Sequence, residues 1–326
     1  MTLMQSIGYP LLNIVFIMLI AILWAAALTW VERRFLGFWQ ERYGPNRVGP
    51  GGVMQVFADI IKLLTKEDFT PTYADRVIFI IAPASLVVAV MMPFGILPIA
   101  EDIGISPDLN IGILFFLAMS SLTVYSAVLG GWASNNKYSL LGGLRGASQM
   151  LAYEVFMGLA LMGVVMITGT FNLQKIVAAQ DNMWFVLPQF LGFIVFVIAG
   201  LAETRRLPYD LPEGEQELVA GYHTEYSSMK FGMYFLGEYL GMILISALIT
   251  TLYFGGWHGP LLPGWLWFML KTAFFLLLFI LLRASLPRPR YDQLTAFGWK
   301  AMLPLALLNF LATGVITLVV LPHGGA

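Results

Sequence analysis

The chain has 326 residues, 59% of them hydrophobic and 11% charged, and its formal net charge is −1. Soluble domains carry about a quarter charged residues, so the composition excludes a water-soluble globular protein and indicates a membrane protein, while the small net charge argues against nucleic acid as a partner. With no cysteine and three histidines, the chain lacks the thiolates that hold iron–sulfur clusters and structural zinc, and we expect it to bind no metal and no redox centre of its own.

Apolar residues form eight segments that are each long enough to cross a bilayer. These segments are residues 8–31, 77–99, 109–133, 146–168, 184–202, 232–254, 262–282 and 301–321. A span must satisfy its own backbone hydrogen bonds, and near-continuous apolarity differs from the alternation of a β-barrel. We therefore predict an all-α polytopic membrane protein in which residues 1–326 form a single integral membrane domain. No cleavable signal peptide is expected, because the first apolar segment is too long for a signal core.

Basic residues are concentrated in alternate connections between these spans. The odd-numbered connections, counted from the N-terminus, hold 16 of the 18 Lys and Arg residues, the even-numbered ones hold only Lys175, and Lys271 lies within a span. By the positive-inside rule, the odd-numbered connections face the cytoplasm and both termini face the outer side. A wrong number of spans would place basic residues on both sides of the membrane, so the asymmetry also supports eight spans.

The first connection contains an amphipathic segment over residues 53–66. Its apolar residues recur at helical spacing and leave a polar face, which predicts a helix too short to span the membrane. Two interpretations stay open: a helix lying on the membrane surface, or the wall of a cavity or docking surface. The preceding sequence GPNRVGPGG breaks any helix and predicts a tight loop.

Three charged residues fall inside predicted spans: Glu154, Glu238 and Lys271. A charge in the middle of a bilayer costs about 2.5–3.5 kcal/mol on insertion scales, so we expect these side chains to face protein or water. Lys271 has a structural interpretation as the ion-pair partner of one glutamate. Because one lysine cannot neutralise every carboxylate, the glutamates are candidates for a proton path.

The acidic loop, residues 203–231, continues into the sixth span at Glu238. Seven of the 19 acidic residues lie between Glu203 and Glu238. Crowding and burial raise carboxylate pKa values and couple their titrations. Glu213 and Glu217 are four residues apart and are expected on one helical face, with Arg205 and Arg206 near enough in sequence to pair with some of the acids. A solvated loop is the alternative, but the interleaved apolar and aromatic residues argue against it.

The seventh connection, residues 283–292, reads RASLPRPRYD and is basic and rich in proline. Its charges are consistent with a simple topology signal and contact with lipid headgroups. A second interpretation is a docking site for an acidic peripheral subunit.

Four motifs together resemble one known family. The segment AETRRLPYDLPEGEQELVAGYHTEYSSMKFGMYFLGEY, ERRFLGFWQERYGPNRVGPGG followed by KLLTKED, LLGGLRGASQMLAYEV, and RASLPRPRYDQL are similar to the H-subunit family of bacterial proton-pumping NADH:quinone oxidoreductases, respiratory complex I. The resemblance extends over essentially the whole chain. The sequence departs from the family pattern at Arg205, Tyr209 and Gly214, where the family often has Asn, Phe and Ala.

The resemblance implies a subunit that forms much of the quinone cavity and lies in the bacterial inner membrane with periplasmic termini. The proton and coupling path it implies comprises Glu154, Asp210, Glu213, Glu215, Glu217, Glu225 and Glu238. The quinone-cavity residues expected with it are Glu32, Arg33, Arg47, Arg206, Tyr222 and His223. Quinone is the implied substrate, while NADH, FMN and iron–sulfur clusters belong to partner subunits. The implied partners are peripheral-arm subunits at the quinone site and small membrane subunits.

Two alternatives stay open at this stage. The membrane subunit of a hydrogenase or formate-hydrogen lyase shares the scaffold but uses no quinone, and the GPNRVGP and YDLPEGEQEL sequences favour the quinone enzyme. A stand-alone ion transporter belongs to a different class, and the absence of visible internal repeats argues against it.

Overall fold

The computed structural model describes residues 9–101, 103–105 and 108–320. Within them, seven helices of at least 18 residues are apolar enough to cross a membrane, and an eighth is apolar but shorter. The predicted all-α polytopic membrane fold is therefore confirmed. The helices are α1 (Tyr9–Trp39), α2 (Gln55–Thr65), α3 (Arg76–Met91), α4 (Gly112–Ala133), α5 (Lys137–Thr168), α6 (Leu173–Ala178), α7 (Phe190–Glu203), α8 (Glu215–Leu218), α9 (Ser228–Tyr253), α10 (Gly264–Ser285), α11 (Tyr291–Phe297) and α12 (Leu303–Val320).

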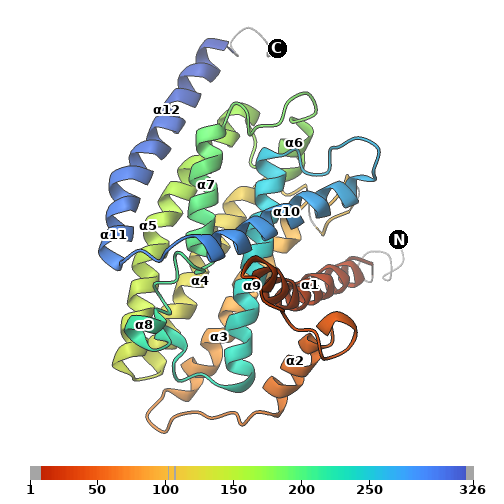
Figure 1. Cartoon of the computed structure of the whole chain (residues 1–326). Coiled ribbons are helices and arrows are strands. Elements are labelled where there is room, and N and C mark those ends of the chain that lie inside the picture. Colours follow the sequence, from red (N-terminus) through yellow and green to blue (C-terminus); the bar gives the residue numbers. More distant parts are fainter. Residues whose placement is uncertain (1–8, 102, 106–107, 321–326) are drawn as a thin grey trace.

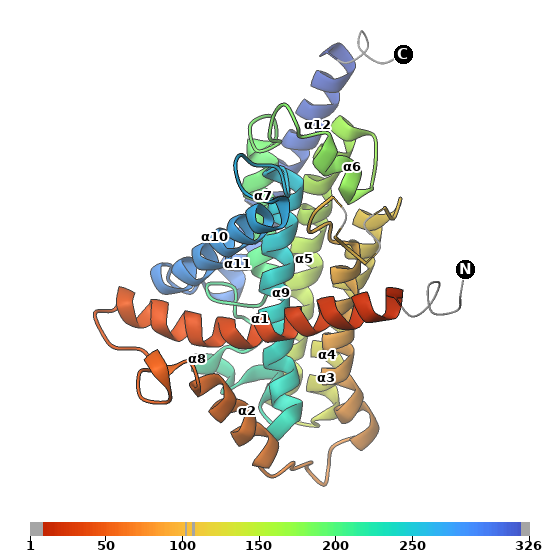
Figure 2. The same cartoon turned by 90° about the vertical axis from the view of Figure 1, so that its right-hand side faces the viewer.

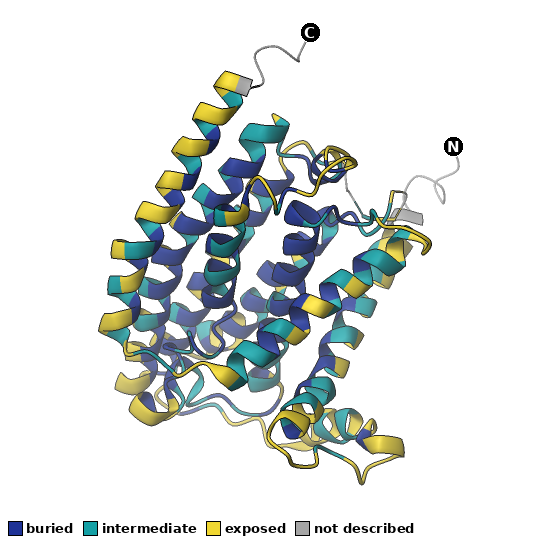
Figure 3. Cartoon of the chain, turned by 45° about the horizontal axis from the view of Figure 1, so that its top comes forward, coloured by how far each residue is buried: buried dark blue, intermediate teal, exposed yellow. Residues whose placement is uncertain are grey.

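Helix α9 is the centre of the bundle, and most of its residues are buried. The upright helices α3 and α7 pack against it, and α4 and α5 pack in turn against α3 and α7, while α1 crosses α9 steeply and α10 is also tilted (Figures 1 and 2). Burial is greatest in the middle of the bundle and least on α12 and α2 (Figure 3). We call the end that carries α2, α8 and the acidic loop the α2 end (Figure 1).

Side-chain caps explain where two of the helices begin. The Asp75 carboxylate accepts hydrogen bonds from the backbone N–H groups of Val77 and Ile78 at 3.1 and 3.3 Å and so starts α3. Asn136 accepts one from Tyr138 N–H at 2.9 Å and starts α5, nine residues before the predicted span. Such caps satisfy donors that the first helical turn leaves free. The glycine-rich sequence LLGGLRGAS is consequently helical and packs against α4.

Two other spans differ from their predicted lengths. Helix α1 continues to Trp39 instead of ending near residue 31, because its polar residue Glu32 has charged partners inside the bundle. Helix α7 starts only at Phe190. Before it, the Gln180 side-chain oxygen accepts hydrogen bonds from the N–H groups of Phe185 and Gly255 at 3.2 and 3.0 Å, which stabilises a non-helical connection.

In the part of the chain that the structure describes, Lys271 forms no ion pair with a glutamate, so the ion-pair interpretation is wrong. Its ammonium group donates hydrogen bonds to the carbonyl oxygens of Phe254, Gly256 and His258 at 2.7, 3.1 and 2.6 Å. It also lies 4.7 Å from the ring centre of Trp184. These carbonyls follow the C-terminal end of α9, where a helix carries partial negative charge. Lys271 therefore fixes that end of α9, and Figure 1 shows that this end of the helix lies away from the α2 end.

Candidate functional site

A cluster of four side chains around the buried Glu32, which we call the Glu32 cluster, joins α1, α9, α10 and the acidic loop. Glu32 is 2% exposed, and both its carboxylate oxygens accept hydrogen bonds from Arg206 Nη1, at 2.8 and 2.7 Å. The Tyr239 hydroxyl donates to Glu32 at 2.6 Å, and Arg283 forms a second ion pair with it. One carboxylate thus holds two guanidinium groups, and it connects the tilted helices to the acidic loop.

Arg206 also extends toward a second carboxylate. Its Nε lies 3.9 Å from Glu238 Oε2, and its guanidinium carbon lies 4.0 Å from the centre of the Tyr239 ring. Burial lowers the pKa of Arg206, but the negative charge of Glu32 and the neighbouring Tyr239 and Glu238 outweigh it and raise that pKa. Arg206 is consequently a permanent positive charge between Glu32 and Glu238.

The carboxyl groups of Glu213 and Glu238 face each other as hydrogen-bond partners. Two carboxyl groups can form such a bond only when they share a proton. Burial raises the pKa of Glu213, but hydrogen bonds from His223 and Glu238, together with the charges of His223 and Arg206, outweigh burial and lower it. The His223 Nε2 atom lies 3.3 Å from Glu213 Oε1. The pair can therefore hold or release one proton in response to a nearby charge.

The remaining acids of the loop have separate partners. Asp210 forms an ion pair with Arg288 at 2.6 Å; burial raises the pKa of Asp210, and Arg288 only partly offsets this. Glu217 pairs with Arg145, and Glu215 is exposed. Glu225 accepts a hydrogen bond from the Asn136 side chain at 2.7 Å. The predicted acids of the loop therefore do not form a single cluster.

The prediction that Glu213 and Glu217 share a helical face is wrong. Helix α8 spans only Glu215–Leu218, so Glu213 lies outside it. Gly214 separates them with a left-handed backbone, φ +49°, which glycine adopts at no steric cost. Glu213 consequently contacts His223 in the loop, while Glu217 pairs with a side chain of α5.

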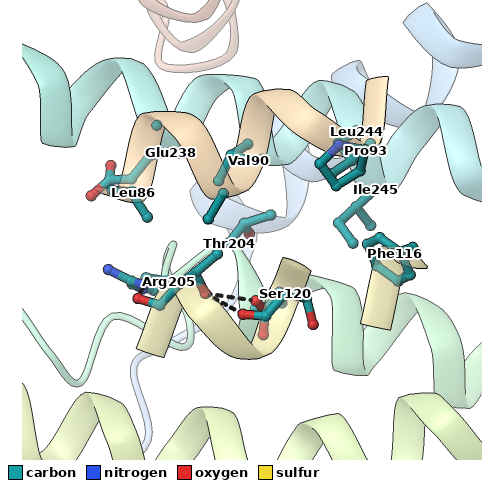
Figure 4. Close-up of a pocket in the computed structure, with 15 residues that line it drawn as sticks. Leu86, Val90, Pro93, Phe116, Ser120, Thr204, Arg205, Glu238, Leu244 and Ile245 are labelled. Carbon is teal, nitrogen blue, oxygen red and sulfur yellow. Dashed lines mark hydrogen bonds between the residues drawn. The ribbon is translucent and has the colours of Figure 1, made fainter. Parts of the chain in front are cut away.

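A small cavity of ≈ 40 Å³ leads from Glu238 into the bundle between α3, α4, α7 and α9. Figure 4 shows Glu238 and Arg205 at one end of it, and Phe116 and Ile245 at the other. Glu203 and Ser120 line the same cavity. This volume is sufficient for a small number of water molecules, and polar side chains line part of it.

Glu154 and Glu203 form a second carboxylate pair beside this cavity. Glu154 accepts a hydrogen bond from the Ser120 hydroxyl at 3.0 Å, and Glu203 accepts one from Thr123 at 3.1 Å. The charges of the two carboxylates interact with each other. The cavity therefore has Glu238 at one end and two further carboxylates, Glu203 and Glu154, bonded to side chains that line it.

Two of the six predicted cavity residues, Glu32 and Arg206, lie together in the Glu32 cluster. Tyr222 and His223 are in the acidic loop, with their rings 4.9 Å apart. Arg33 instead pairs with Asp59 of α2 at 2.6 Å. Arg47 lies in the loop after α1 and is exposed, so it takes no part in the Glu32 cluster.

An aromatic stripe on α9 joins His223 to the Glu32 cluster. Phe231, Phe235 and Tyr239 are spaced four residues apart, and their rings are 6.1 and 5.0 Å from one another. His223 contacts Phe231 edge-on at 5.4 Å. Phe231 and Phe235 are half-buried, so part of this apolar surface faces outward next to α2, which packs on α9.

Sequence reasoning missed several residues of the site. Glu203 is one of the loop acids, but it is not among the residues predicted for the proton path. Its position in the last turn of an apolar helix is the signal that could have identified it. Tyr239 follows Glu238 directly and continues the aromatic spacing of α9. The partners Asp59, Arg283 and Arg288 are far away in sequence, and no local signal identifies them.

The chain is similar to known proteins along nearly its whole length. The family described as NADH dehydrogenase matches residues 12–314. A relative from Methylococcus capsulatus, described as the H-subunit of an NADH-quinone oxidoreductase, is 57% identical over 315 residues, which cover 96% of this chain and 99% of the relative. Both matches agree with the family predicted from the sequence motifs.

Proposed function

Because the chain belongs to the NADH dehydrogenase family and is a membrane subunit of an NADH-quinone oxidoreductase, complex I, we propose that it forms much of the quinone cavity and couples quinone reduction to proton translocation. Its partners are other subunits of that complex. In this proposal the peripheral-arm subunits bind NADH and carry FMN and iron–sulfur clusters, and they supply the electrons. Small membrane subunits complete the contacts of this chain.

The proposed location is the bacterial inner membrane, with the α2 end in the cytoplasm and both termini in the periplasm. The concentration of 16 of 18 basic residues in alternate connections supports this orientation. The acidic loop then lies at the cytoplasmic side, where it can contact the peripheral arm. Of the arginines in residues 283–292, Arg283 and Arg288 are used internally, so Arg290, with 74% of its side chain exposed, remains for a partner.

The aromatic stripe of α9 is the proposed surface for the quinone. An isoprenoid quinone presents an apolar tail and a flat headgroup with two carbonyl oxygens, which suit aromatic side chains and a few placed donors. The stripe has His223 at one end and the Glu32 cluster at the other. We propose that the headgroup meets polar groups at the His223 end. Reduction to quinol consumes electrons from the partner subunits and an equal number of protons.

The carboxylates respond to this change of charge. In the proposal, Glu213 is the first responder because it is hydrogen-bonded both to His223 and to Glu238. Loss or gain of charge at the headgroup changes how the Glu213–Glu238 pair holds its proton. The proton then has a path through the 40 Å³ cavity to Glu203 and Glu154. Asp210, Glu215, Glu217 and Glu225 set the charge of the loop around the pair.

The contact between Glu213 and Glu238 is the single observation on which this proposal rests most. To test it, Glu213→Gln is introduced into the intact complex, and quinone reductase activity and proton pumping are measured in proteoliposomes. We expect both to fall by about tenfold or more, because the pair no longer shares a proton. Electron transfer from NADH to an artificial acceptor at the flavin should be unchanged.

Asp292→Asn is the matched control, since the Asp292 side chain is 71% exposed and, among the described residues, pairs with Arg290. Its complex should pump normally. If the Glu213→Gln complex reduces quinone and pumps protons as this control does, the proposed role of the pair is wrong.

A further inference from the structure

Three buried tyrosines form a cluster between the acidic loop and α4, which we call the phenol cluster: Tyr222, Tyr226 and Tyr234. The ring of Tyr234 meets that of Tyr222 edge-on at 5.0 Å and that of Tyr226 at 4.9 Å. All three are at most 7% exposed. The cluster contributes three hydroxyl groups to a region that is otherwise tightly packed.

The hydroxyls of Tyr226 and Tyr234 converge over a glycine. A Cβ atom on Gly130 of α4 would collide with the Tyr234 hydroxyl and would lie 3.4 Å from that of Tyr226. Tyr234 also donates weakly to the carbonyl of Ser126, at 3.4 Å. Within the described part of the chain, the Tyr222 and Tyr226 hydroxyls have no partner with good hydrogen-bond geometry. Buried hydroxyls without partners cost about 1–3 kcal/mol each, so packing alone does not explain them.

The inner end of the cluster meets the carboxylate pair. Tyr234 and Glu238 are four residues apart on α9 and both are buried, which places their side chains on the same face. The charges of Glu238 and Glu213 act on Tyr222, and the Arg205 guanidinium lies 5.6 Å from the Tyr222 ring. The cluster therefore lies close enough to the Glu213–Glu238 pair for the charges of the pair to act on Tyr222.

The outer end of the cluster lies close to the surface of the α2 end. The Tyr226 ring stacks on Phe79 at 4.0 Å, and Ile78, the residue before Phe79, lines an open surface cavity of ≈ 190 Å³ with Tyr73 and Asp75. Glu225 precedes Tyr226, and its carboxylate lies near the Tyr73 side chain. A surface cavity with acidic groups thus lies about one layer of side chains away from the phenol cluster.

A phenol can pass a proton without becoming charged. Its oxygen accepts an incoming proton on a lone pair while its own O–H proton leaves to the next acceptor, so the hydroxyl is restored after each transfer. Burial raises the pKa of the Tyr222 and Tyr226 phenols, which keeps both neutral. Water molecules can bridge hydroxyls that do not touch directly.

We propose that Tyr226, Tyr234 and Tyr222 form a proton-uptake path from the surface cavity at Tyr73 and Asp75 to the Glu213–Glu238 pair, separate from the aromatic stripe on α9. The path rests on the proposed function, because it delivers protons to the carboxylates of that proposal. It gives the pair a supply of protons that does not pass through the quinone.

Replacing tyrosine by phenylalanine tests the path, because it removes only the hydroxyl and keeps the ring. Tyr234→Phe and Tyr226→Phe are introduced separately into the intact complex, and proton pumping and quinone reductase activity are measured in proteoliposomes. We expect pumping to fall by at least about tenfold in each. Tyr253→Phe is the matched control: Tyr253 lies on the same helix, is fully buried and also has a hydroxyl without a partner among the described residues, but lies at the far end of α9. This control should pump normally.

The path is wrong if both tyrosine variants pump as fast as the Tyr253→Phe complex. In that case a Glu213→Gln complex that is still impaired leaves the carboxylate proposal intact, whereas normal pumping in Glu213→Gln removes the carboxylate proposal as well. Gly130→Ala provides a second variant, since the added methyl group displaces the Tyr234 hydroxyl; combined with Tyr234→Phe it relieves the clash without restoring the hydroxyl. We expect the double variant to assemble and to pump as poorly as Tyr234→Phe, and normal pumping by it would also overturn the path.

Discussion

Arg206 donates from a single nitrogen, Nη1, to both carboxylate oxygens of Glu32, across 174 residues of sequence. The two residues come from the connection after α7 and from the tilted helix α1. Because Arg283 of α10 binds the same carboxylate, the pair fixes α1 and α10 to the acidic loop. These tilted helices are therefore joined to the residues proposed to carry protons.

Glu32→Gln should destabilise the complex strongly. Removing one partner of a buried ion pair leaves an uncompensated charge and costs about 3–5 kcal/mol; Arg206 is 7% exposed, and its other carboxylate contact among the described residues is Glu238 at 3.9 Å. We expect a clear drop in the temperature at which quinone reductase activity is lost. The control Asp292→Asn breaks an exposed pair worth about 0–1 kcal/mol, and equal inactivation temperatures for the two variants would contradict the assignment.

Arg288→Gln should change how stability depends on pH. Burial already raises the pKa of Asp210, and Arg288 opposes this, so its loss raises that pKa further. Between the ordinary and the raised pKa the folded protein binds more protons than the unfolded one, so stability falls as pH rises through that window. We expect the variant to lose heat stability between acidic and neutral pH more steeply than the wild type. Arg290→Gln, at a 74% exposed position, should give a wild-type profile; identical profiles for both variants would show that Arg288 does not control Asp210.

Lys271→Met should weaken the fold without changing coupling. The ammonium group makes three hydrogen bonds to backbone carbonyls, and hydrogen bonds to charged groups contribute about 1.5–3 kcal/mol. We expect less assembled complex, with an unchanged number of protons pumped per electron in the fraction that assembles. Lys175→Met, at an exposed position on α6, is the control for loss of charge. A changed ratio at normal stability would instead place Lys271 in the proton path.

Single cysteines can determine the orientation, because the chain contains none. Leu261 is fully exposed in the connection between α9 and α10, and Tyr43 is 91% exposed after α1. We expect a membrane-impermeant maleimide to label Leu261→Cys from the periplasmic side, and Tyr43→Cys only after the membrane is made permeable. Labelling with the opposite preference would reverse the proposed topology.

Much of the fold is local information and could be predicted from the sequence. The long apolar runs determine the helices, and helical spacing predicted α2 close to its observed bounds. The errors have physical causes. Residues 137–145 fall in the predicted connection before residue 146, but they form the first turns of α5 after the Asn136 cap. Helix α1 extends past its apolar run because the partners of Glu32 lie on other helices and in the acidic loop.

The site was less predictable, because its contacts join distant parts of the chain. Sequence identified Glu154, Glu213 and Glu238 as unusual carboxylates, and the structure brings Glu213 and Glu238 together. It could not indicate that Arg206 would bind Glu32 and not the acids of its own loop. Nor could it show that Lys271 would bind carbonyls, since hydrogen bonds to the backbone leave no pattern in residue identities.

Infrared difference spectroscopy of the reconstituted complex tests the central claim most directly, because it detects the C=O stretch of protonated carboxyl groups. Quinone reduction should change the C=O stretch signal of protonated carboxyl groups in the wild type and in Asp292→Asn. This change should be lost in Glu238→Gln, because Glu238 is half of the pair that shares a proton. If the Glu238→Gln complex gives the same carboxyl signal as the wild type while quinone is reduced, these carboxylates do not respond to quinone, and the proposed coupling is contradicted.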